Sequence, residues 1–227
     1  MTAPPGGHPE LAANVAAAGV QLETVNQARE VSLAACRRTI RAAGRSIRAV
    51  HRLDTDTARQ LLAECEAEVR AAQEAAAPFP ALAGAGFLHD AEKEYAEAAL
   101  LPALIDGSPV ADHRALAVGL PAWLNGLAEA ASELRRHLLD RLREGRTATA
   151  EDLLATMEEV YELLVSVEQP DAVTAGLRRT ADALRAVLER TRSDVTATIQ
   201  QLRLIAALEG AGGASGNSGE GPGPAVR

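Results

Sequence analysis

Two pairs of glutamates in this sequence have the spacing that places carboxylates on one face of a helix. Glu94 and Glu97 are three residues apart in EKEYAEA, and Glu129 and Glu133 are four apart in EAASELRR. Residues at these separations lie on the same side of an α-helix. If the two helices pack through these faces, four carboxylates converge, and they cannot all stay ionised without a cation. Such an oxygen-rich site suits Mg²⁺ or Mn²⁺, which would polarise a phosphodiester and activate a bound water.

Two alternatives compete with this metal site. Glutamates at helical spacing are also common on solvated faces, so the spacing by itself does not separate a site from a surface. A di-iron bundle would need two Glu-x-x-His pairs, and the only histidine nearby, His137, follows Glu133 by four residues, which excludes that design. Gly126, Ala130 and Ser132 are small residues of the helix that carries Glu129 and Glu133, and they would let another backbone approach this helix closely.

Arginines form the second group of residues that could do chemistry. The row has spacings of 4, 4, 3 and 4, which place it on one side of a helix: Arg37, Arg41, Arg45, Arg48 and Arg52. Residues 29–52 hold seven arginines and one acid, in a chain whose net charge is −8. Because like charges at this spacing repel, the row is expected either to pair with acids, in the chain or at a subunit interface, or to bind phosphates.

Positioning these residues requires long helices, and the apolar pattern predicts them. Hydrophobic residues make up 47% of the chain but aromatic residues only 2%, and no segment alternates at period two. We therefore predict an all-α fold, a single-domain bundle of six to seven helices. The six main helices are expected over about residues 11–52, 55–77, 88–105, 121–144, 149–169 and 171–209. Their ends are predicted from Asp54 or Thr55 as an N-cap, Gly145 as a C-cap, and Thr149 with Asp152 as a capping box.

The segments outside these helices are short. Residues 1–9 are rich in Pro and Gly and residues 210–227 in Gly and Ser, so both are predicted to be disordered, flanking one helical domain at 10–209. The N-terminus lacks the regions of a signal peptide, and no apolar run reaches the roughly 20 residues that span a bilayer. We expect a cytoplasmic protein without a membrane partner. Cys36 and Cys65 are expected to be small buried residues, and the five dispersed histidines to be packing or surface residues.

Five segments of the chain together resemble the translin family. They are REVSLAACRRTIRAAGRSIRAVHR (29–52), EYAEA (94–98), GLAEAASELRRHLLDRLREG (126–145), MEEVYELL (157–164) and GLRRTADALRAVLERTRSD (176–194). Their order and approximate spacing match over about residues 25–205. The resemblance implies a seven-helix fold, assembly into closed multimers, here a homo-oligomer, and binding of single-stranded RNA or DNA. One branch of the family, translin-associated factor X, is a Mg²⁺-dependent endoribonuclease.

The acidic motifs of that nuclease branch fall on the two glutamate pairs of this chain. The resemblance implies that Glu94, Glu97, Glu129 and Glu133 are both catalytic and metal-binding, with Mg²⁺ or Mn²⁺ as cofactor. The arginine row, Arg37 to Arg52, would bind the nucleic acid. Two departures from the family pattern are Glu129, where the usual residue is Asp, and Ser132, where it is Gly; the longer Glu129 side chain could shift a bound metal.

Three functions therefore remain to be weighed. The first is a Mg²⁺-dependent endoribonuclease acting on single-stranded RNA. The second is a non-catalytic homo-oligomer that binds single-stranded RNA or DNA. The third is a structural helical protein whose arginines form ion pairs. We expect the first, with the second as the main alternative.

Overall fold

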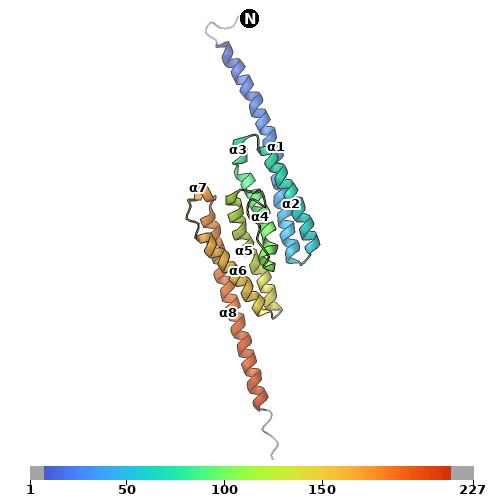
Figure 1. Cartoon of the computed structure of the whole chain (residues 1–227), viewed down its shortest axis with the longest axis vertical. Coiled ribbons are helices and arrows are strands. Elements are labelled where there is room, and N and C mark those ends of the chain that lie inside the picture. Colours follow the sequence, from blue (N-terminus) through green and yellow to red (C-terminus); the bar gives the residue numbers. More distant parts are fainter. Residues whose placement is uncertain (1–7, 216–227) are drawn as a thin grey trace, which may run out of the picture.

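The computed structural model describes residues 8–215, and within this range the chain forms eight α-helices and no strand (Figure 1). Six helices are long: α1 (Pro9–His51), α2 (Thr55–Ala76), α4 (Gly86–Asp106), α5 (Leu120–Arg143), α6 (Thr147–Val165) and α8 (Leu177–Ser215). The other two, α3 (Pro80–Ala83) and α7 (Asp171–Thr174), are single turns within connections. The all-α prediction is confirmed. No helix of the described range is long and apolar enough to cross a membrane.

The predicted helix ends are partly confirmed. The Asp54 carboxylate caps α2 by accepting a hydrogen bond from the backbone N–H of Thr57 at 3.2 Å. Gly145 follows α5 with φ of +74°, a left-handed conformation that glycine adopts without strain. The capping box predicted at Thr149 is wrong, because α6 already begins at Thr147 and Arg146 precedes it without a side-chain cap.

The predicted continuous helix over 171–209 is also wrong at its start. Ala175 (φ 51°) and Gly176 (φ 82°) are left-handed and separate α7 from α8. The break is stabilised by Asn125 of α5, a buried residue that donates its amide N–H to the Thr174 carbonyl at 3.0 Å and accepts from the Thr180 hydroxyl at 2.6 Å. These long-range hydrogen bonds outweigh the local preference for a continuous helix.

The helices pack in three layers, with α4 and α5 at the centre (Figure 1). The hairpin of α1 and α2 covers one side, and α6 and α8 cover the other. The six largest fully buried side chains belong to the main core. Four come from the central helices, Leu100 and Leu101 of α4 and Leu134 and Leu138 of α5, and the others are Met157 of α6 and Leu184 of α8. Many alanines fill the remaining positions, which lets the helices approach closely. Cys36 and Cys65 are buried as predicted.

Two helices extend beyond this body at opposite ends (Figure 1). Residues 10–24 of α1 and residues 200–209 of α8 are all exposed. The α8 helix continues to Ser215, past the boundary expected at 209, whereas residues 1–7 and 216–227 lie outside the described residues. Disorder is predicted for residues 1–9 and 210–227; α1 and α8 already include Pro9 and residues 210–215, and for the residues outside the described range the disorder stays a prediction.

Candidate metal centre

A backbone contact between the two central helices determines where the carboxylates lie. A Cβ atom added to Gly126 of α5 would lie 2.7 Å from the Lys93 carbonyl oxygen and 2.8 Å from the Ala96 Cβ of α4. It would also lie 3.0 Å from the Glu97 backbone nitrogen. Only glycine fits this crossing, as its position in the sequence suggested. The crossing brings the glutamates of α4 beside those of α5.

Three of the four predicted carboxylates converge at this crossing. One oxygen each from Glu94, Glu97 and Glu129 lies within 4.8 Å of the other two. Glu129 stands where the family pattern has an aspartate, and its carboxylate nevertheless lies beside the glutamates of α4. Ser132 is accommodated within α5, where its hydroxyl donates to the Ala128 carbonyl at 3.0 Å.

Glu97 is the carboxylate with the greatest need for a cation. Glu97 is only 8% exposed, and its carboxylate forms no hydrogen bond or ion pair within residues 8–215. Burial, together with the charges of Glu129, Glu94 and Glu133, raises the pKa of Glu97 to about 8. Burial is also the main cause that raises the pKa of Glu94 above its ordinary value. A proton or a cation must compensate the buried charge.

A lysine inside the cluster supplies one positive charge. Lys93 is the only lysine of the chain, and its Nζ donates to both oxygens of Glu129 at 2.7 and 2.6 Å and lies 3.4 Å from Glu94. Burial lowers the pKa of Lys93, but the hydrogen bonds and charges of Glu129 and Glu94 outweigh burial, so the net pKa is raised. Lys93 is not among the residues predicted for the site, although it is the single lysine of the sequence and directly precedes Glu94 in EKEYAEA.

Glu133, the fourth predicted carboxylate, contacts α1 instead of joining the group of three. Its Oε2 lies 2.6 Å from Nε2 of His51, whose side chain is 3% exposed. The other ring nitrogen of His51 is buried without a partner in the described structure. The expectation that every histidine is a packing or surface residue is incomplete here, because His51 binds a carboxylate next to the centre.

The arginine row lies along the solvent face of α1. All five members are exposed, and none of them forms an ion pair within residues 8–215. In contrast, Arg38, outside the row, pairs with Glu68 at 2.7 Å. Pairing of the row with acids of the described chain is thus excluded. Arg48 and Arg52 lie within one turn of His51, but none of the five arginines forms an ion pair with the carboxylate cluster in the described structure.

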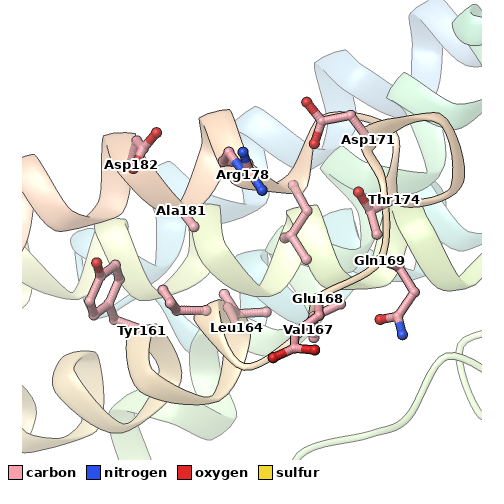
Figure 2. A pocket seen from close by; sticks show the side chains of 12 residues that line it. Tyr161, Leu164, Val167, Glu168, Gln169, Asp171, Thr174, Arg178, Ala181 and Asp182 are labelled. Carbon is pink, nitrogen blue, oxygen red and sulfur yellow. The ribbon is translucent and has the colours of Figure 1, made fainter.

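The pocket in Figure 2 lies elsewhere in the molecule. It has a volume of about 360 Å³ and is formed by the end of α6, the connection through α7 and the start of α8. Its charged lining consists of Glu168, Asp171 and Asp182 around the single cation Arg178. This excess of acids does not complement a phosphate, and the pocket shares no residue with the carboxylate cluster.

Comparison with known proteins identifies the group to which this chain is related. No protein-family model matches the sequence. Two solved structures, AfC3PO and AfC3PO in a complex with duplex RNA, are 32% identical to it, with TM-scores of 0.75 and 0.76. Each alignment covers 84% of this chain, and 99% and 98% of the respective structure.

More distant matches agree with this relationship. The structure of apo-NeC3PO shares the fold, with a TM-score of 0.73 at 17% identity, over 87% of this chain and 100% of that one. An uncharacterised protein of Methanocaldococcus jannaschii is 28% identical over 185 residues, which are 81% of this chain and 82% of that protein. With five family-like segments in register and C3PO/translin-type structures matched along most of its length, the chain belongs to the translin family.

Proposed function

We propose that this protein is a metal-dependent endoribonuclease that binds and cleaves single-stranded RNA. The observation that carries the proposal is the group of Glu94, Glu97 and Glu129, in which Glu97 is buried without a partner among the described residues. Glu97 is 8% exposed, and a carboxylate so largely shielded from water costs stability unless a cation or a proton compensates its charge. A cation-binding site explains it.

The donor set fits Mg²⁺ or Mn²⁺. Carboxylate oxygens are the ligands these ions prefer, and Mg²⁺ is usually held by few carboxylates with water and substrate phosphate completing its shell. Glu94, Glu97 and Glu129 would hold the ion, and Glu133, fixed by His51, would orient ligands beside it. A bound divalent ion would supply Lewis-acid activation of the phosphodiester and a water of lowered pKa.

The direct test is cleavage of a 5′-labelled single-stranded RNA by the wild-type protein in a titration of Mg²⁺ and of Mn²⁺. We expect cleavage that requires the ion and stops on chelation. RNA left intact across both titrations, at protein concentrations that saturate binding, would leave the non-catalytic alternative as the function.

RNA binding is supported by the exposed, unpaired arginine row and by the solved complex of AfC3PO with duplex RNA. The scarcity of aromatic residues leaves few platforms for base stacking, so binding must depend on phosphate contacts. Affinity should accordingly fall steeply with salt and depend little on sequence. The same surface would serve the alternative function, a non-catalytic module binding single-stranded RNA or DNA.

Reversing two charges of the row should weaken RNA binding. For the double variant Arg41→Glu with Arg45→Glu, we expect at least about 10-fold weaker binding at low salt. The plot of log K against log salt should become less steep by about 1.4, which corresponds to the loss of two phosphate contacts at about 0.7 each. Fluorescence anisotropy of a labelled RNA across a KCl series measures both quantities.

A matched control is available on α8. Arg179 and Arg190 are exposed on a different helix, and changing both to Glu alters the net charge by the same amount. This control should retain most of the wild-type affinity. Equal losses in the two double variants would show that binding responds to net charge and not to the row.

We also propose that the protein assembles as a homo-oligomer through its projecting helices. The exposed part of α1 carries Leu11, Val15 and Leu22, and that of α8 carries Leu202 and Ile205, each at least 43% exposed. On α1 these residues continue at helical spacing into Val25, which packs on the body. Apolar seams of this kind are typical of helices that bury them against a partner.

Charges in the α1 seam should therefore dissociate the assembly. For Val15→Glu with Leu22→Glu, we expect light scattering to report a smaller species than for wild type, with the body still helical by circular dichroism. Ala13→Glu with Thr24→Glu puts the same charges on the opposite side of that helix and should keep the wild-type mass. A wild-type protein that is monomeric at all concentrations would refute the homo-oligomer.

A further inference from the structure

Lys93 places its ammonium group beside two of the three converging carboxylates, those of Glu94 and Glu129. Its ammonium group is bonded to both oxygens of Glu129 and lies 3.4 Å from Glu94. It is 19% exposed, so its contacts are largely shielded from water. An ammonium is a compact point charge, comparable in placement to a bound cation.

The geometry points to a centre that holds one divalent ion and uses Lys93 as its second, built-in cation. This inference rests on the metal site proposed above. Ions of a two-metal site lie about 3.5–4 Å apart and share bridging carboxylates. In this chain both oxygens of Glu129 already accept from Lys93, so the ammonium group takes the place of a second ion on Glu129. Each oxygen keeps a further lone pair, so Glu129 can still contact the single ion.

Charge balance leads to the same stoichiometry. The three converging glutamates contribute −3 when ionised, and Lys93 reduces this to −2. One divalent ion neutralises the group, whereas two would leave an excess of positive charge before any substrate binds. The carboxylate without a partner in the described structure is Glu97, so the single ion is expected on the Glu97 side of the cluster, with Glu94 shared between ion and lysine.

The stoichiometry can be measured directly with Mn²⁺. Calorimetric titration, together with the electron paramagnetic resonance signal of free Mn²⁺, should give one ion per wild-type chain and two per Lys93→Met chain. Lys93→Arg, which keeps the charge, should bind one. Arg135→Met removes a different half-buried ion pair of α5, with Asp194 at 2.7 Å, and should also bind one.

The outcomes separate this inference from the proposed function. Two ions in the wild-type protein, or the same number in wild type and Lys93→Met, would overturn the role of Lys93 while leaving the metal site in place. No binding to either protein would refute the metal site itself and the inference with it.

A second measurement uses the unaltered protein and does not depend on the folding of a variant. Because Lys93 is the only lysine, selective ¹⁵N-lysine labelling yields a single Nζ resonance. We expect this resonance to keep the slow proton exchange of a bonded ammonium when Mg²⁺ is saturating. Its change to the rapidly exchanging signal of a free ammonium would show that the metal displaces Lys93, which contradicts the inference.

Discussion

Replacing Glu97 with glutamine is expected to lower the rate of Mg²⁺-dependent cleavage of single-stranded RNA by about 10²- to 10³-fold. The amide has nearly the same size as the carboxylate but carries no charge for a divalent ion. The lost charge stabilisation is a few kcal/mol, and each 1.4 kcal/mol corresponds to about a factor of ten in rate. RNA affinity should be nearly unchanged, because the arginine row lies on the solvent face of α1. Single-turnover cleavage and anisotropy measure the two effects separately.

Glu74→Gln is the matched control for this substitution. Glu74 is exposed on α2 and has no ion pair within the described residues, and the chemical change is the same. It should cleave RNA at the wild-type rate. If Glu97→Gln also cleaved at that rate, the buried carboxylate would have no part in catalysis, and the proposed centre would have to be abandoned.

The free energy of unfolding of the metal-free protein should fall as the pH rises from about 5 to about 8. Glu97 has a pKa of about 8 in the folded chain, against an ordinary value of 4.5. Between these values the folded state binds more protons than the unfolded state, so stability is lost with rising pH. At about 1.4 kcal/mol for each pKa unit, the loss is at most about 5 kcal/mol. Urea unfolding in the presence of a chelator, at a series of pH values, measures it.

Comparison with Glu97→Gln isolates this contribution from those of other titrating groups. The variant should be more stable than wild type at pH 8 without metal, and the difference should disappear near pH 4.5. Saturating Mg²⁺ should restore the stability of wild type at pH 8 and have little effect on the variant. Identical pH profiles for the two metal-free proteins would show that Glu97 titrates normally.

The two effects of this substitution have opposite signs, which makes them a specific test. A residue kept only for packing would lose stability when altered, whereas Glu97→Gln is expected to gain stability and lose activity. This combination is typical of residues whose charge serves a function at the expense of the fold.

Features that depend on helical periodicity could be predicted from the sequence. The pairing of Glu94 with Glu97 on one face follows from the turn of the helix, and Gly126 marked the place where another backbone comes close. The N-cap at Asp54 and the left-handed Gly145 follow from local backbone chemistry. These are all properties of short segments, in which neighbouring residues determine the outcome.

Features that depend on contacts between distant segments could not be predicted. The break between α7 and α8 is held by Asn125, which is about 50 residues away in the chain. His51 reaches Glu133 only because the end of α1 lies beside α5. Lys93 has a long flexible side chain, and its position in the sequence does not show whether that side chain points toward Glu129 or toward solvent.

The helix crossing at Gly126 has a consequence for how the carboxylates respond to their own repulsion. The distance between the two helix backbones is set here by atoms in contact, while the leucines of the core on the same two helices resist any parting of α4 from α5. The repulsion among the glutamates therefore cannot be relieved by moving the helices apart. A proton, Lys93 or a bound cation must relieve it instead, so the packing of α4 against α5 keeps the cluster able to bind positive charge.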